Sequence, residues 1–98
     1  MALLAASANG HTARVNHLIR LGADIDHADE RGLTALHHAA YSGWEDTIEL
    51  LLSRDADSEA QAGLWGTPLH LAAVKGRVNV VRLLLQKRAV VDARSGLL

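Results

Sequence analysis

The stretch GTPLHLAAVKG at residues 66–76 decides the fold. Its first glycine lets the backbone turn, and Thr67 can cap a helix whose first position, Pro68, needs no N–H donor. The apolar residues that follow recur at helical spacing and predict one narrow apolar face. Gly76 ends this helix, and the apolar stripe within residues 78–85 predicts another. Two short helices around a tight turn cannot bury both of their faces alone, so this unit requires neighbours.

The same pattern occurs 33 residues upstream, as TALHHAAYSG at residues 34–43. A less regular third copy opens the chain, where the apolar positions of residues 3–23 precede those of residues 36–56 by the same step. A period of this length, with threonine, leucine and histidine opening a helix pair, resembles the ankyrin repeat. The resemblance covers nearly the whole chain.

The resemblance implies an all-α solenoid of stacked helix-turn-helix units joined by short β-hairpin-like loops, here called fingers. We expect a single ankyrin-repeat domain over residues 1–98. Its repeat units are expected at about residues 1–28, 29–61 and 62–94, with residues 95–98 starting a truncated further unit.

Composition narrows the class of protein. There are only three aromatic residues among 98, so an aliphatic core is expected. A formal net charge of −1 argues against nucleic acid or an anionic membrane surface as the main partner. The absence of cysteine excludes disulfides and thiolate metal sites, and no apolar run is long enough to span a membrane. We expect an intracellular protein, in the cytoplasm or the nucleus.

The connecting segments depart from strict repetition. Asp55 and Arg88 stand where the first copy has Gly22, which predicts a positive φ at both positions if that site requires one. Trp65 stands where the preceding finger has Gly32, so we expect the second finger to take a different path. The large indole is expected to lie against the neighbouring helices rather than in water.

The histidines raise the question of a metal site, with His37, His38 and His70 as the possible ligands. His37 and His70 recur at the repeat period, which favours a structural role. The resemblance implies that their rings form hydrogen bonds to the threonine-led turn and to the next connection. His38 has no histidine counterpart in the other copies, so it is either free to contact a ligand or simply a surface residue.

Catalysis is not expected. The carboxylate pairs Asp24/Asp26 and Asp55/Asp57 lie in polar connections with nothing nearby to raise one pKa, as general acid catalysis requires. No nucleophile–base pair and no phosphate-binding glycine loop is visible. The sequence therefore predicts a protein that is not an enzyme and uses no cofactor and no metal.

The resemblance implies a protein–protein interaction module, which binds a partner of unknown identity through its finger tips and the concave face of its inner helices. Positions that differ between copies are the best candidates for recognition. Tyr41 is the aromatic residue among them, either a binding anchor or an ordinary exposed helix residue. The predicted partner-binding residues are Glu30, Arg31, Leu33, His38, Tyr41, Ser42, Leu64, Val74 and Lys75.

Two further expectations concern the ends of the array. The first helix is apolar or small on nearly every side, whereas terminal repeats of a solenoid normally carry a polar outer face. Self-association through uncapped terminal repeats is therefore expected. The alternative function is a structural spacer or autoinhibitory segment cut from a longer ankyrin-repeat protein.

Overall fold

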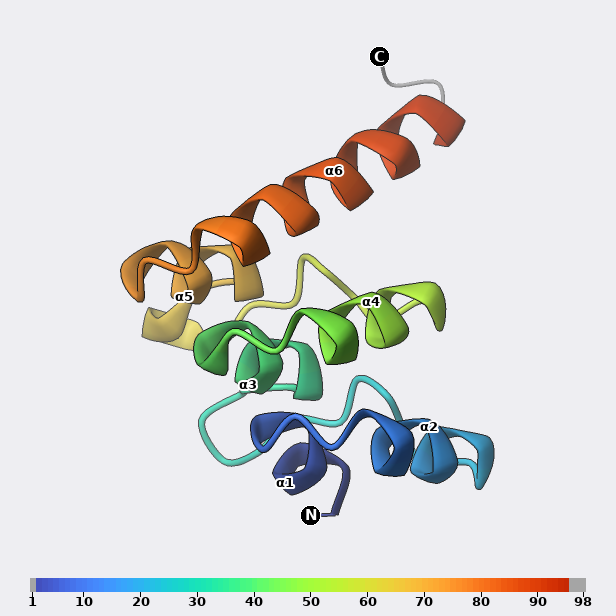
Figure 1. Ribbon diagram of the computed structural model, residues 1–98. Helices are drawn as coiled ribbons and strands as arrows, with labels where there is room; N and C mark the ends of the chain where they lie inside the picture. Colours follow the sequence, from blue (N-terminus) through green and yellow to red (C-terminus); the bar gives the residue numbers. More distant parts are fainter. Residues whose placement is uncertain (1, 96–98) are drawn as a thin grey trace.

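The computed structural model describes the backbone of residues 2–95 and the side chains of residues 2–87. Three helix pairs follow one another, and a 3-10 turn precedes the third pair. The first helices of the pairs stack as an inner layer, and the second helices stack as an outer layer (Figure 1). The elements are α1 (Ala2–Ala8), α2 (Thr12–Arg20), α3 (Ala35–Ser42), α4 (Glu45–Ser53), η1 (Gly63–Trp65), α5 (Pro68–Val74) and α6 (Val78–Ser95).

Threonine caps begin two of the inner helices, as predicted. Thr34 closes a capping box: its Oγ1 accepts from His37 N–H at 3.4 Å, and its own N–H donates to His37 Nδ1 at 3.1 Å. Thr67 Oγ1 accepts from His70 N–H at 3.2 Å, with Pro68 at the first helical position. The described residues contain helices and no strand, which confirms the predicted all-α repeat fold.

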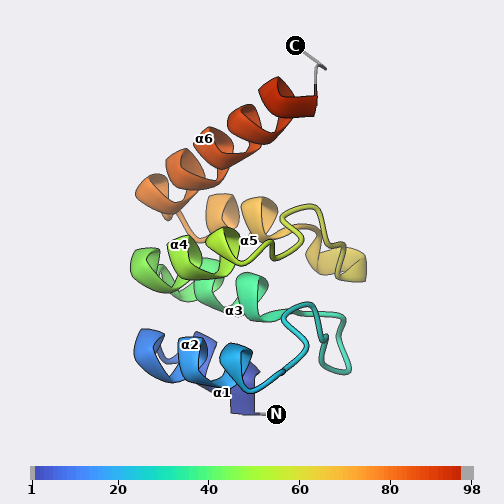
Figure 2. The same cartoon turned by 90° about the vertical axis from the view of Figure 1, so that its right-hand side faces the viewer.

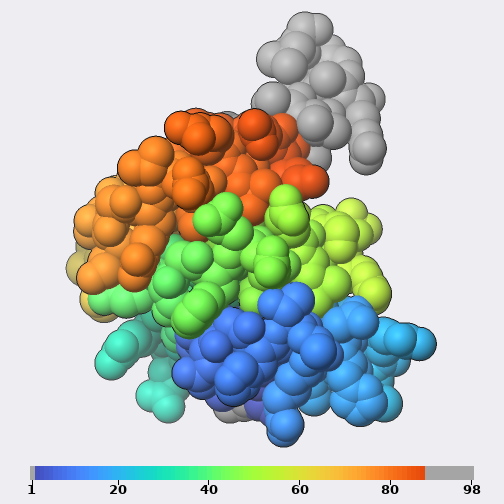
Figure 3. Space-filling view, in the orientation of Figure 1, coloured from blue at the N-terminus to red at the C-terminus, as the bar shows by residue number. Residues whose placement is uncertain are grey.

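The core is aliphatic and runs through the stack between the two layers. The inner helix α3 packs against α1 on one side and α5 on the other, so it is the most completely covered element. Figure 3 shows the outer surface, where successive repeats form bands from blue through green to orange. The buried core residues include Leu3, Leu4, Ala6, Val15, Ala35, Leu36, Ala39, Ala40, Ile48, Leu51, Ala56, Ala72, Val80 and Leu84.

The first finger is the loop between α2 and α3, and the second is the loop between α4 and α5. Both fingers project from the same side of the stack (Figure 2). The first closes with a bond from Asp29 N–H to the Leu33 carbonyl, and the second with a bond from Ala62 N–H to the Gly66 carbonyl; both are 2.9 Å long. These are the same positions one repeat apart, so the two fingers close with the same bond. Between those positions the second finger takes a different path, as predicted, because its residues 63–65 form the 3-10 turn η1. Trp65 is not among the residues with positive φ, unlike Gly32 at the same position of the first finger (84°), and the positive φ values of the second finger lie at Gly63 (55°) and Gly66 (73°).

The C-terminal helix differs from expectation. Residues 88–95 continue α6, and helical backbone has φ near −63°, so the prediction of a left-handed Arg88 is wrong. The physical reason is that residues 78–95 contain no glycine or proline to end the helix. Residues 96–98 lie outside the described residues.

The turns between paired helices are linked by a side-chain bond that recurs at one position. Trp44 Nε1–H donates to the Ala8 carbonyl at 2.8 Å, at the end of α1. One repeat later, Arg77 Nε–H donates to the Tyr41 carbonyl at 3.2 Å, near the end of α3. Both bonds satisfy a carbonyl that the end of a helix leaves without an intrahelical partner. An indole and a guanidinium therefore perform the same function.

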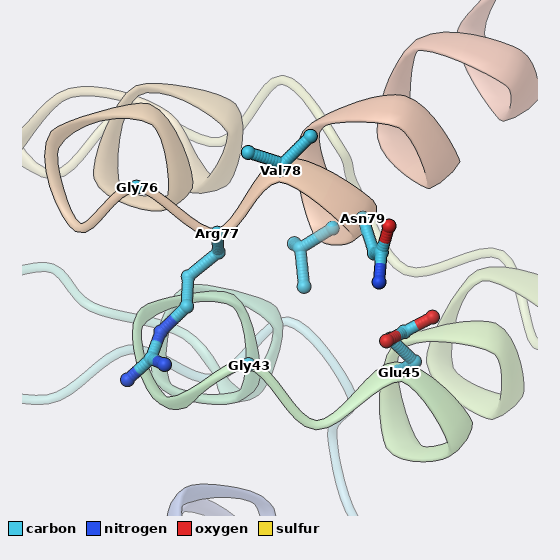
Figure 4. Close-up of a pocket in the computed structure, with 7 residues that line it drawn as sticks. Gly43, Glu45, Gly76, Arg77, Val78 and Asn79 are labelled. Atoms are coloured by element: carbon cyan, nitrogen blue, oxygen red, sulfur yellow. The ribbon is translucent and has the colours of Figure 1, made fainter.

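A glycine lies beneath each of these side chains. A Cβ on Gly10 would come within 2.5 Å of the Trp44 ring, and a Cβ on Gly43 within 3.1 Å of Arg77 Cδ. Figure 4 shows the Arg77 side chain running down from its own turn towards Gly43. The glycine of the turn is therefore required both for its positive φ and for the close approach of the next repeat.

Gly10→Ala and Gly76→Ala separate these two requirements. The two glycines have similar φ values of 71° and 69°, but no atom of the described residues lies within 4 Å of a Cβ built on Gly76. We expect Gly76→Ala to lower the free energy of unfolding by about 1–2 kcal/mol through strain alone. Gly10→Ala should cost at least about 1 kcal/mol more, because the Trp44 ring must move and its bond to Ala8 is lost.

Urea unfolding of both variants measures this difference. In a Trp44→Ala background the additional cost of Gly10→Ala should disappear, since no ring then opposes the Cβ. Equal losses for Gly10→Ala and Gly76→Ala in the otherwise unchanged protein would show that the contact with Trp44 is unimportant.

Asp55 does adopt the predicted left-handed conformation, with φ 64°, next to Arg54, the C-cap of α4. Because glycine has no Cβ to strain there, we expect Asp55→Gly to raise the free energy of unfolding by up to about 1 kcal/mol. Asp55→Ala is the matched control, since it removes the carboxylate and keeps the Cβ. Thermal unfolding should place the Gly variant above the native protein and the Ala variant below it. A stabilised Ala variant would assign the effect to charge rather than to backbone strain.

Candidate functional site

A groove of about 260 Å³ lies where the two fingers meet the inner helices. Its walls come from the first finger, from α3, from η1 and from α5. The side chains that line it are mainly apolar or aromatic, with a cation at one edge. The lining residues are Arg31, Leu33, His37, His38, Tyr41, Trp65 and Leu71.

His37 fixes the base of this groove. Its side chain is fully buried, its Nδ1 accepts from Thr34 N–H, and its Nε2–H donates to the Gly66 carbonyl at 2.8 Å. The ring therefore joins the start of α3 to the end of the second finger, next to Trp65. Burial lowers the pKa of His37, while the Gly66 carbonyl opposes that change. The imidazole is accordingly held neutral with its proton on Nε2.

Asp29 shapes the first finger. Its Oδ1 accepts from Arg31 N–H at 2.9 Å and from Leu33 N–H at 3.0 Å, and its Oδ2 accepts from His38 Nε2–H at 3.0 Å. Partial burial of the carboxylate opposes ionisation, but these three donors and the nearby His38 lower the pKa of Asp29. The His38 ring thus ties α3 to the finger and positions the two finger residues that line the groove.

Two half-exposed aromatic rings give the groove its apolar surface. Tyr41 is 44% exposed on α3, and Trp65 is 46% exposed on η1. Lys75 Nζ lies 4.9 Å from the centroid of the Tyr41 ring, within the range of a cation–π interaction. The ammonium group therefore adds a positive charge at the tyrosine side of the groove.

Four of the nine predicted partner-binding residues meet in this groove, namely Arg31, Leu33, His38 and Tyr41, and a fifth, Lys75, lies over Tyr41. The other four do not line it. Leu64 is fully exposed in η1, and Val74 is exposed at the end of α5. Glu30 is exposed in the first finger, and Ser42 is partly buried at the end of α3.

Three lining residues were not among those predicted: His37, Trp65 and Leu71. Trp65 was expected to lie against helices, and a large aromatic residue at a glycine position in a finger is the signal that could have placed it here. Leu71 occupies the position of His38 one repeat later, so the rule that variable positions form the binding face includes it, although it is not one of the nine predicted residues. His37 carries no such signal because its position recurs.

The side chains of His37, His38 and His70 do not come together at one site. Both ring nitrogens of His37 are engaged by backbone groups and His38 is engaged by Asp29, while His70 is exposed. The ring of His70 has no hydrogen-bond partner among residues 2–87. Within the described part of the chain, no three His, Asp or Glu side chains come together in a way that could hold a metal ion.

A larger hollow of about 350 Å³ lies on the opposite, turn side of the stack, between Gly43 and Asn79 (Figure 4). Backbone glycines and polar side chains make up most of its walls, and Arg77 is already bonded to the Tyr41 carbonyl there. It offers no apolar anchor comparable to Tyr41 and Trp65. None of the described helices has both the length and the apolar character needed to cross a membrane.

The fold and the site define a helical repeat protein of the solenoid class, with a groove on its finger side. The family described as ankyrin repeats (3 copies) matches residues 3–95. The chain belongs to the ankyrin repeat family.

The relatives that share this repeat have names that describe three different kinds of protein. A stretch of 57 residues is 47% identical to the probable protein S-acyltransferase 23 of Arabidopsis thaliana, covering 57% of this chain and 11% of that protein. A stretch of 59 residues is 41% identical to protein phosphatase 1 regulatory subunit 27 of Homo sapiens, covering 60% and 38% respectively. A stretch of 49 residues is 41% identical to potassium channel AKT2 of Oryza sativa subsp. japonica, covering 50% and 6%.

The chain thus spans well under half the length of each of these relatives. Because an acyltransferase, a regulatory subunit and a channel all contain the similar stretch, the similarity identifies the repeat rather than a common activity. Ankyrin repeats are generally protein-interaction modules, and that general role extends to this chain.

His37 should make the stability of the protein depend on pH. Its pKa in the folded protein lies below the ordinary value of 6.5, so the unfolded chain binds a proton first as the pH falls. Stability is therefore fully present above pH 6.5 and is lost as the pH falls towards the lowered pKa of the folded state. We expect the native protein to lose more stability than His37→Gln on this acidification, measured by urea unfolding at each pH.

The exposed His27 provides the control, since His27→Gln should keep the pH dependence of the native protein. Asp29 does not interfere, because its lowered pKa removes stability only at pH values around and below 3.8. Parallel pH profiles for the native protein and His37→Gln would contradict the assignment.

Proposed function

We propose that this chain is a non-catalytic domain that binds a partner protein through the finger-side groove between its second and third repeats. The observation that carries the proposal is the convergence of Arg31, Leu33, His38 and Tyr41 in one groove with Trp65. All five stand at positions where the repeats differ from one another. Side chains needed for stacking recur at the repeat period, so these five are available for recognition.

The exposure of the aromatic rings supports the same function. Tyr41 and Trp65 each leave more than 40% of their surface in water. Aromatic residues are enriched among the side chains that contribute most to protein–protein binding. A groove of about 260 Å³ is smaller than the roughly 300–1,000 Å³ of typical small-molecule sites, so it suits one or two side chains of a partner better than a cofactor.

The proposal that the domain has no chemistry of its own rests on the arrangement of its polar side chains. His37 is held neutral by two backbone groups, and His38 donates to a carboxylate within the finger. Neither ring is directed at a nucleophile in the described part of the chain. The human relative is named a regulatory subunit, which fits a role in which a domain of this family directs another protein.

Tyr41→Ala tests the binding face. A partner captured from a cell extract is identified, purified, and titrated against the native domain and its variants by calorimetry. We expect Tyr41→Ala to weaken binding by about 1–2 kcal/mol, or about 5- to 30-fold, because a central aromatic anchor is lost. The free energy of unfolding should change by less than about 0.5 kcal/mol, since the ring is half exposed.

Leu21→Ala is the matched control, because Leu21 is 70% exposed, lies just after α2 of the outer layer and does not line the groove. It should bind the partner as the native domain does. Unchanged affinity for Tyr41→Ala, or a loss of affinity that follows from unfolding, would exclude the groove as the binding face.

A further inference from the structure

The geometry points to a particular kind of partner: a peptide segment that places an apolar side chain in the groove and an Asp or Glu carboxylate beside it. This inference rests on the proposed function and adds the chemistry of the ligand. It follows from three features of the groove: the apolar base, the two cations at its edges, and the way in which the nearest carboxylate is already occupied.

The base of the groove accepts an apolar group. Leu33 and Leu71 come from the first finger and from α5, and they line the groove together with the rings of Tyr41 and Trp65. His37 beneath them has both ring nitrogens bonded to backbone groups, so it offers no free polar atom to a ligand. An inserted polar side chain would therefore lose its water without gaining a hydrogen bond from His37, whereas an apolar side chain would bury its surface.

Two cations stand at the edges of the groove without a carboxylate partner among residues 2–87. Arg31 lines the groove from the exposed first finger. Lys75 sits over the Tyr41 ring on the α5 side. Among residues 2–87, the ion pair that the structure contains is the one between His38 and Asp29, so neither Arg31 nor Lys75 is neutralised by a side chain within 4.0 Å. Both can receive a ligand carboxylate, which a guanidinium binds with two parallel N–H donors.

The carboxylate nearest to the groove does not repel such a ligand strongly. Both oxygens of Asp29 are already occupied, because Oδ1 accepts from two backbone N–H groups of the finger and Oδ2 accepts from His38 on α3. These three donors offset its charge locally. Glu30 is exposed in the first finger and does not line the groove. The unpaired charged side chains that a bound carboxylate would meet among the described residues in and over the groove are therefore the cations Arg31 and Lys75.

A random peptide library displayed on phage provides the probe. Selections run in parallel on the native domain, on Tyr41→Ala, and on the charge-reversed double variant Arg31→Glu/Lys75→Glu. The matched control is Arg14→Glu/Lys87→Glu, which changes the net charge equally at exposed positions of α2 and α6. Thermal unfolding verifies that every variant is folded before selection.

We expect the native domain and the control variant to enrich peptides in which Asp or Glu lies within about three residues of a large apolar side chain. A synthetic peptide of this kind should bind Arg31→Glu/Lys75→Glu at least about tenfold more weakly, and binding should weaken as salt is added. Replacing its acidic residue by Lys should restore binding to the charge-reversed variant and weaken binding to the native domain.

The outcomes separate this inference from the proposed function. Peptides that require Tyr41 but carry basic or uncharged residues beside the apolar group would overturn the acidic ligand and leave the groove as a binding face. Selected peptides that bind Tyr41→Ala as well as they bind the native domain, or the absence of any selected peptide, would overturn both.

Discussion

The buried imidazole of His37 is the constraint on which the finger side of this protein depends. Its Nδ1 accepts from the capping residue Thr34, and its Nε2–H donates to the Gly66 carbonyl at the end of the second finger. One side chain therefore fixes the start of α3 and the position of the next finger at the same time. Each buried polar atom of the ring needs its partner, so a displaced finger would leave an unsatisfied group in the core.

The turn side is held by a bond whose position recurs while its residue changes. Trp44 and Arg77 lie one repeat apart, and each donates an N–H to a carbonyl at the end of the preceding inner helix. The glycines beneath them leave room for an indole in one repeat and for a guanidinium in the next. Stacking in this array therefore depends on the position of the donor, which lets the sequence vary at that site.

Recognition uses the face that these constraints leave free. The fingers and α3 bring cationic, aliphatic and aromatic side chains to one groove, because His38 and Asp29 hold the first finger and His37 holds the second. Positions that vary between repeats predicted four of the seven lining residues. Leu71 and Trp65 also stand at positions that vary between repeats. Which of the varying side chains meet depends on how the repeats stack, because a groove between two repeats has walls from both of them.

The sequence by itself determined the repeat period, the helix pairs, their threonine caps and the family, because these follow from local spacing and backbone preference. The tertiary structure decided whether the same residue, at equivalent positions of two repeats, is buried and which hydrogen bonds it forms. His37 is buried and bonded at both nitrogens, whereas His70 at the equivalent position is exposed. Likewise Ala40 is buried and Ala73 is exposed. The reason is that α3 packs against an inner helix on each side, while α5 packs against α3. Burial and hydrogen bonding depend on neighbours from other repeats, and no local pattern in the sequence contains them.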